Sequence, residues 1–201
     1  LGAHLAHRQH EGADVHAVAH HRRTPEAGEQ QGANRQATFV LGDGQLGHAL
    51  AAASATAGSG DVPIGAVVLS AEGEVIGTGW NVREAEGDPT GHAEVVALRE
   101  AGRHTGSWRL DGCTLAVTLE PCAMCAGALM LARVDRVVFG AWDPKAGACG
   151  SVWDLPRERR ALHRVEVIGG VREQECSALL LDFFDKRRPS RDAGEGDGSR
   201  R

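Results

Sequence analysis

The chain lacks any apolar segment near the roughly 18 residues that a membrane-spanning helix requires. Its N-terminal residues also lack the basic and then apolar layout of a secretory signal peptide. A disulfide framework is missing too, because the five cysteines are odd in number and irregularly spaced. We therefore expect a soluble, cytoplasmic protein that keeps its thiols reduced and has no membrane association.

A net positive charge is also absent, since the formal net charge is -5. The whole-chain charge therefore gives no sign of a nucleic-acid partner. Basic side chains nevertheless outnumber acids near the C-terminus, and such a cluster is either a contact surface for a nucleic acid or a solvated face with a basic tail. The basic residues of this cluster are Arg157, Arg159, Arg160, Arg164, Arg172, Lys186, Arg187, Arg188 and Arg191.

Large apolar side chains are scarce in residues 1–40, which are rich in His, Gln, Gly and Ala. This composition builds no core, so we expect a disordered or non-native leader there. His16 and His20 have the spacing of a helical metal chelate, although a chance pair in a disordered segment is the simpler interpretation. Residues 189–201 are rich in Gly, Ser and charge, and we expect a disordered tail. The folded domain is placed at 41–188.

Within this domain, short β-branched runs alternate with helical patterns after an initial hairpin. This alternation predicts an α/β domain with a mixed sheet. Helices are predicted over 46–55, 92–102, 123–134 and 172–188, and strands over 64–70, 73–80, 113–120, 134–141 and 163–170. Leu179, Leu180, Phe183 and Phe184 are available for burial on the last helix.

The segment "TLEPCAMCAG" places Cys122 and Cys125 three residues apart, directly after a predicted strand. A single C-x-x-C motif fits a redox pair, half of a structural metal site, or ligands of a catalytic metal. About thirty residues upstream, His92 supplies a third zinc ligand. Three protein ligands leave one position open for water, which is typical of catalytic zinc. Cys113 and Cys149 are the remaining candidates for a fourth, structural ligand.

Both motifs fall at the start of a predicted helix, where the backbone favours the thiolate form that zinc binds. Glu94 follows His92 by two residues. A carboxylate beside the ion, but not bound to it, moves protons between water, a ring nitrogen and a leaving amine. The combination H-x-E with P-C-x-x-C is a known signature of zinc nucleobase deaminases. We therefore assign the cysteines and His92 to one Zn²⁺ per subunit.

From Gly44 to Arg188 the sequence resembles the bacterial tRNA-specific adenosine deaminases, which convert adenosine to inosine at the wobble position of an anticodon. The resemblance implies a three-layer α/β/α sandwich with a central mixed five-stranded sheet, as in cytidine deaminases, and a homodimer that acts on a tRNA anticodon stem-loop. The segments that carry it include "VPIGAVV", "GTGWNVRE", "DPTGHAEVVALREAG", "TLEPCAMCAGALMLARVDRVVFGAWDPKAGACGS" and "ECSALLLDFFDKRR".

The same resemblance implies roles for individual residues. His92, Cys122 and Cys125 match the zinc ligands and Glu94 matches the proton shuttle. The positions that match substrate contacts are Asn81, Asp143, Lys145, Phe184, Arg187 and Arg188. For Phe184, core packing is the alternative role, and for the two arginines it is a solvated helix end.

Two residues depart from the family pattern: Leu162 stands where asparagine is usual, and Ala116 where tyrosine is common. Neither belongs to the expected zinc centre. The nearest alternative function is a sister deaminase that acts on a free guanine, cytosine or nucleotide, because the zinc chemistry is shared. A zinc-stabilised RNA-binding module without turnover and a redox C-x-x-C protein are the alternatives from other classes.

Overall fold

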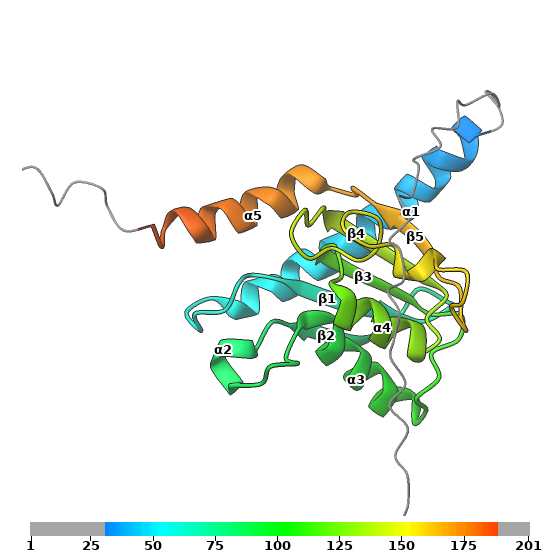
Figure 1. Ribbon diagram of the computed structural model, residues 1–201, viewed down its shortest axis with the longest axis horizontal. Helices are drawn as coiled ribbons and strands as arrows, with labels where there is room; N and C mark the ends of the chain where they lie inside the picture. Colours follow the sequence, from blue (N-terminus) through cyan, green and yellow to red (C-terminus); the bar gives the residue numbers. More distant parts are fainter. Residues whose placement is uncertain (1–30, 189–201) are drawn as a thin grey trace, which may run out of the picture.

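The computed structural model describes the backbone of residues 31–188 and the side chains of residues 42–188. At its centre is a five-stranded sheet with the strand order β2-β1-β3-β4-β5 (Figure 1). β1 is antiparallel to β2 and β3, whereas β3, β4 and β5 are mutually parallel. The predicted mixed five-stranded sheet is confirmed. Its strands are β1 (Gly65–Leu69), β2 (Val75–Trp80), β3 (Thr114–Leu119), β4 (Arg136–Ala141) and β5 (Glu166–Gly169).

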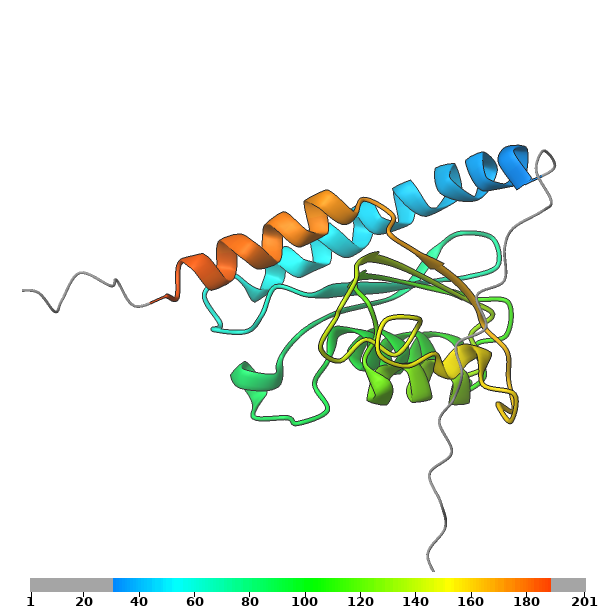
Figure 2. The ribbon, with the colours of Figure 1, turned by 45° about the horizontal axis from the view of Figure 1, so that its top comes forward.

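Helices cover both faces of this sheet (Figure 2). α1 and α5 lie side by side on one face, and α3 and α4 lie on the other, which gives the expected three-layer arrangement. A short helix, α2, and two 3₁₀ turns lie in the connections. The helices are α1 (Gln31–Ala53), α2 (Arg83–Glu86), α3 (Ala93–Thr105), α4 (Ala123–Leu131) and α5 (Glu173–Asp185), and the 3₁₀ turns are Ser54–Thr56 and Leu155–Arg157.

Each face of the sheet has its own apolar core, because side chains alternate between the two faces along every strand. On the α3 and α4 face, Leu115, Val117 and Val137 pack with Leu129 of α4. On the α1 and α5 face, the core contains Leu46 of α1, Cys176 of α5 and the strand residues Val67, Ala116 and Val138.

The approach of α3 to β2 is close enough to require glycine. A Cβ atom at Gly77 or Gly79 would overlap the α3 backbone at Ala97. Small side chains on the helix complete the fit, since Ala93 and Ala101 are fully buried. Because β2 lies at the edge of the sheet and α3 begins beside it, this contact fixes where the first turn of α3 lies.

α1 begins at Gln31, whereas the sequence predicts a helix only from residue 46. The expected boundary of the leader near residue 40 therefore falls inside this helix. The His16 and His20 pair and the tail at 189–201 lie outside the described residues.

Between residues 31 and 188, no helix has both the length and the apolar character that crossing a membrane requires.

The two departures from the family pattern lie in different environments. Ala116 is fully buried in the core beneath α1. Leu162 is 88% exposed in the connection before β5, and its carbonyl accepts a hydrogen bond of 2.9 Å from Arg133. The first departure thus affects sheet packing and the second affects only the surface.

Candidate active site

The candidate metal ligands lie at the starts of two neighbouring helices. His92 immediately precedes α3 and Cys122 immediately precedes α4, both with extended backbone, as the sequence predicts. Cys125 lies in the first turn of α4. The unpaired N–H groups and the positive dipole end of a helix favour negative charge at these positions. Two helix starts therefore converge on one place with the polarity that thiolate ligands need.

The distances between the three side chains suit a single zinc ion. His92 Nδ1 lies 3.6 Å from Cys122 Sγ and 3.5 Å from Cys125 Sγ, and the two sulfurs lie 3.7 Å apart. Tetrahedral zinc with ordinary bond lengths holds two sulfurs about 3.8 Å apart and a sulfur and a nitrogen about 3.6 Å apart. The donor set and its spacing thus fit Zn²⁺.

A fourth protein ligand is not present among the described side chains. The candidate cluster there consists of His92, Cys122 and Cys125. Cys113 and Cys149 are buried free thiols outside this cluster. Three ligands with one open position are the arrangement of a catalytic site, so the structural-zinc alternative is not supported.

The two cysteine thiols have very different affinities for a proton. Contact with Cys125, opposed by burial and supported by His92, lowers the pKa of Cys122 to about 3. The Cys122 sulfur, together with burial and Glu94, raises the pKa of Cys125 above its usual range. A second thiolate therefore forms only beside a positive charge, which a divalent cation supplies.

Glu94 lies in the first turn of α3 and is only 4% exposed. Burial raises the pKa of its carboxyl group to about 7. Glu94 is not a member of the metal-ligand cluster, although it lines the same cavity as His92 and Cys122. A carboxyl group that gains and loses a proton near neutral pH, beside a metal site, is suited to general acid-base catalysis.

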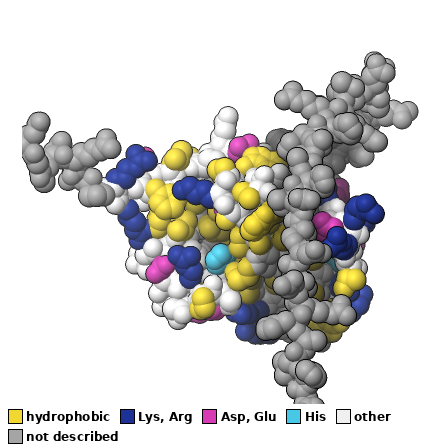
Figure 3. Space-filling view, in the orientation of Figure 1, with side chains coloured by type: hydrophobic (Ala, Val, Ile, Leu, Met, Phe, Trp, Pro, Cys, Tyr) yellow, Lys and Arg dark blue, Asp and Glu magenta, His cyan; other side chains and the backbone are white. Residues whose placement is uncertain are grey.

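A cavity of about 740 Å³ opens onto this centre. Most of its wall is apolar, with a few polar and charged groups among them. On the face shown in Figure 3, hydrophobic side chains gather between groups of Lys and Arg side chains. Four of the predicted substrate-contact residues line the cavity: Asn81, Asp143, Lys145 and Phe184.

Hydrogen bonds fix the orientation of Asn81 in the cavity wall. Its amide nitrogen donates to the carbonyl of Val62 at 3.3 Å, and its side-chain oxygen accepts from the backbone N–H of Arg83 at 3.4 Å. In the same cavity wall, Asp143 accepts hydrogen bonds from the backbone N–H groups of Lys145 and Ala146 at 2.9 and 3.2 Å. Both side chains are therefore held by hydrogen bonds with the backbone of nearby segments.

The sequence makes Leu179, Leu180, Phe183 and Phe184 of the C-terminal helix available for burial, and the structure separates Phe184 from this set. Phe184 is 50% exposed and lies in the cavity wall, so core packing is not its role. Arg187 and Arg188 do not line this cavity. The Arg187 guanidinium lies 3.8 Å from the centre of the Phe183 ring, and Arg188 lies 3.6 Å from Asp185.

The residues of the cavity wall that were not singled out from the sequence include Arg83, Glu120 and Trp142. Arg83 and Trp142 carry no pattern that separates them from other surface residues. Glu120 does carry a signal, because an acid that ends a buried strand directly before a metal-binding motif is unusual. Its side chain is only 2% exposed.

Comparison with known proteins agrees with this geometry. Residues 45–141 match the family model of the cytidine and deoxycytidylate deaminase zinc-binding region. The chain is 49% identical to the tRNA-specific adenosine deaminase of Bacillus subtilis over 134 residues, which are 67% of this chain and 83% of the relative.

Two solved structures extend the comparison. One comes from work on A-to-I editing by tRNA:A34 deaminases at the wobble position of transfer RNA. It aligns with a TM-score of 0.65 and 38% identity over 68% of this chain and 99% of its own. The other is a guanine deaminase from Nitrosomonas europaea, with a TM-score of 0.59 and 25% identity over 70% and 83% of the two chains.

The layered fold, the three-ligand centre and the family match together define a zinc-dependent hydrolytic deaminase. Within this class, the chain belongs to the family of tRNA-specific adenosine deaminases.

Proposed function

We propose that this protein converts adenosine to inosine at the wobble position of tRNA anticodons. The observation that carries the proposal is a single cavity that joins the zinc-ligand cluster and Glu94 to the polar groups Asn81, Asp143 and Lys145 and to the aromatic ring of Phe184. Such a cavity suits a nucleoside that leaves its base stack, because its wall combines apolar surface with a few hydrogen-bonding groups.

Each group at the centre has a distinct duty. His92, Cys122 and Cys125 would hold the zinc ion, which supplies Lewis-acid chemistry and lowers the pKa of water. Hydrolytic deamination adds water across the C6–N1 bond of adenine, breaks the bond from C6 to the exocyclic nitrogen, and releases ammonia. Glu94 would accept the first proton of the attacking water and deliver it to ring nitrogen N1. It would then take the remaining proton of the hydroxyl added at C6 and pass it to the leaving amine, which leaves the carbonyl of inosine.

Recognition of the base and the loop belongs to the cavity wall. The Asn81 amide has both a donor and an acceptor, so it can bind an adenine edge or a ribose hydroxyl. Phe184 offers a stacking surface at the mouth of the cavity. Arg187 and Arg188 follow the C-terminal end of the same helix, where they would contact the phosphates of the anticodon loop. A tRNA substrate also places the protein in the cytoplasm.

Deamination of an anticodon stem-loop, free adenosine, guanine and cytosine by the purified protein tests the proposal. We expect inosine at the wobble position and a kcat/KM for the stem-loop that is orders of magnitude above that for free bases. Comparable kcat/KM values for a free base would favour the sister-deaminase alternative, for which the similarity to a guanine deaminase structure is the supporting observation.

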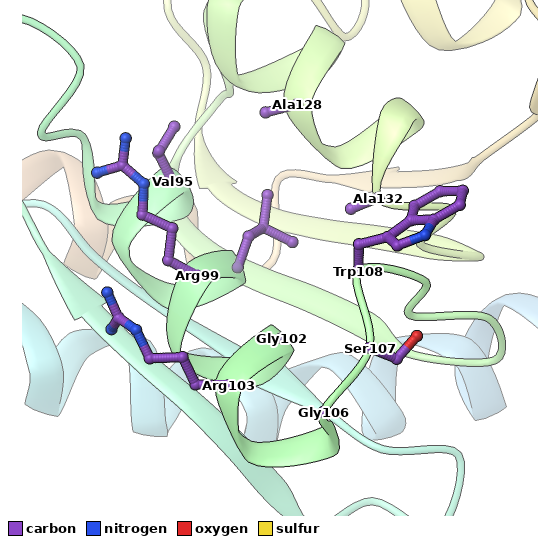
Figure 4. A pocket seen from close by; sticks show the side chains of 10 residues that line it. Val95, Arg99, Gly102, Arg103, Gly106, Ser107, Trp108, Ala128 and Ala132 are labelled. Atoms are coloured by element: carbon purple, nitrogen blue, oxygen red, sulfur yellow. The ribbon is translucent and has the colours of Figure 1, made fainter.

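We further propose that the protein forms a homodimer through the surface between α3 and α4. A hollow of about 540 Å³ lies there, and Val95, Arg99, Ala128 and Ala132 face it (Figure 4). Trp108, at its edge, is 66% exposed, and Leu131 at the end of α4 is 72% exposed. The hollow and the exposed Trp108 at its edge support a protein contact there, because exposed apolar patches mark interaction sites.

A further inference from the structure

The loop that follows β4 is folded around one buried carboxylate. Glu120 Oε2 accepts a hydrogen bond from the backbone N–H of Asp143 at 3.1 Å. Its Oε1 accepts from the backbone N–H groups of Cys149 and Ser151 at 2.9 and 3.0 Å. The Ser151 hydroxyl also donates to Oε2. One side chain thus receives four donors from both ends of the segment 143–151.

The same loop is joined directly to the segment that carries a zinc ligand. Cys122 forms an isolated antiparallel bridge with Gly147. The Ala148 N–H donates to the carbonyl of Pro121 at 2.8 Å. Glu120 therefore lies two residues before a metal ligand and anchors the loop that presents Asp143 and Lys145 to the cavity.

Gly147 shows how tightly the loop wraps the carboxylate. A Cβ atom at this position would overlap the Glu120 carboxylate and the carbonyl of Asp143. Burial of an acid at 2% exposure is costly unless its oxygens are hydrogen-bonded, and here both oxygens are. In the described part of the chain, the hydrogen-bond donors to Glu120 are three backbone N–H groups and the Ser151 hydroxyl, and none of them is a cation.

We infer that Glu120 is a positioning residue, which sets the shape of the segment 143–151 and thereby the substrate-facing wall of the active site. It does not touch the reacting atoms. The inference about shape stands on the contacts above, whereas its kinetic consequence rests on the proposed function. Loss of Glu120 should release the loop while leaving the zinc ligands and Glu94 in place.

Amide hydrogen exchange of zinc-loaded Glu120→Gln tests the inference without any substrate. An amide side chain has one acceptor oxygen where the carboxylate has two, so the donors of Asp143, Cys149 and Ser151 cannot all be satisfied. We expect exchange at these amides to rise roughly tenfold or more, with one zinc per chain and unchanged exchange in β3 and β4. The matched control is Glu166→Gln, an exposed acid on β5 that pairs with Arg136.

Kinetics separates a positioning role from a purely stabilising one. We expect KM for the anticodon stem-loop to rise roughly tenfold and kcat to stay within about threefold. A residue that only stabilised the fold would lower zinc content and apparent kcat and leave KM unchanged. If wild-type protein fails to deaminate the stem-loop, the proposed function is wrong, and hydrogen exchange alone still decides the role of Glu120.

Two other variants cover the case in which Glu120→Gln does not fold. Ser151→Ala removes one donor, and Gly147→Ala pushes the loop away from the carboxylate. Both variants should raise amide exchange in the segment 143–151 and should also raise KM for the stem-loop. The larger effect is expected for Gly147→Ala. Wild-type exchange in this segment for all folded variants would overturn the inference, as would an equal rise throughout β3 and β4.

Discussion

His92 Nδ1 and Cys122 Sγ lie 3.6 Å apart although thirty residues separate them in the chain. The first belongs to the start of α3 and the second to the start of α4, and both helices lie on the same face of the sheet. The metal site is therefore a product of the fold and not of one local motif. Metal binding can therefore be tested separately from the residues of the cavity wall that would contact the substrate.

We expect purified protein to contain one zinc per chain and no disulfide between Cys122 and Cys125. Zinc occupies both sulfurs and keeps them from oxidation, whereas their separation of 3.7 Å allows a disulfide once the metal is removed. Thiol counting by mass spectrometry, before and after chelation and oxidation, checks this. A metal-free protein with a reversible disulfide as isolated would support the redox alternative.

Glu94→Gln should keep zinc and fold but lose turnover by roughly 10²- to 10⁴-fold, because the amide cannot transfer a proton. The measurements are kcat, zinc content and the thermal midpoint. Glu173→Gln is the matched control, since Glu173 is also an acid in the first turn of a helix but is exposed. Turnover close to wild type in Glu94→Gln would reject Glu94 as the proton carrier and would favour another residue of the cavity.

Phe184→Ala should weaken binding of the anticodon stem-loop roughly tenfold without loss of stability. Stacking of a base on an aromatic ring contributes about 1–3 kcal/mol, and this ring is 50% exposed, so its removal leaves no cavity in the core. Fluorescence anisotropy with a labelled stem-loop gives the binding affinity, and urea unfolding gives the free energy of unfolding. A large drop in the free energy of unfolding would instead indicate a packing role.

Arg187→Ala should reduce the salt dependence of stem-loop binding by about one unit in the slope of log K against log salt concentration. Its guanidinium lies over the Phe183 ring, which holds the charge on the turn that follows α5. Arg109→Ala is the control, because Arg109 pairs with Asp111 in the loop after α3. An identical slope for Arg187→Ala and wild type would leave Arg187 as a solvated helix end.

Asp61 should give the fold a pH dependence at the acidic end. Burial opposes its ionisation, but hydrogen bonds from the backbone N–H groups of Glu84 and Ala85 outweigh this and lower the pKa of Asp61. A lowered folded-state pKa contributes stability above the unfolded value of about 3.9, and that stability is lost as pH falls through the folded pKa.

Asp61→Asn should therefore cost about 1–3 kcal/mol in the free energy of unfolding between pH 5 and pH 8. The difference from wild type should shrink as pH falls below about 4. Urea titrations at several pH values measure it. A difference that stays constant into the acidic range would show that ionisation of Asp61 does not contribute.

Leu131→Glu should convert the proposed dimer to a monomer, since a buried unpaired charge at an interface is strongly unfavourable. Light scattering after size-exclusion chromatography reports the mass. Val75→Glu changes another exposed apolar residue, on the edge strand β2, and should leave the mass unchanged. A monomeric wild-type protein would contradict the proposed interface directly.

Much of the fold follows from local patterns in the sequence. The hairpin of β1 and β2 agrees with prediction because two short β-branched runs flank a turn, and the starts of α3 and α4 agree because helical patterns follow extended segments there. The part of α1 before residue 46 was not predicted, since its mostly polar and small residues do not repeat apolar side chains at helical spacing. The positions of β4 and β5 within the sheet depend on long-range pairing, which no local pattern records.

The candidate site likewise contains residues that the sequence predicts and residues that only the fold brings together. The ligands and Glu94 come from two short motifs with fixed chemistry, so their roles are readable from residue types and spacing. Phe184 lies in the cavity wall only because the fold brings α5 to the cavity, and Glu120 accepts hydrogen bonds from residues that lie 23 to 31 positions away. Such contacts are set by tertiary structure.

α3 and α4 supply the reactive groups from one side of the sheet, whereas α5 reaches the same cavity from the opposite side. Under the proposed function, we therefore expect mutations in α5 to alter the choice of substrate and to leave the deamination chemistry unchanged. An exchange of this one helix between relatives with different substrates becomes a practical route to new selectivity.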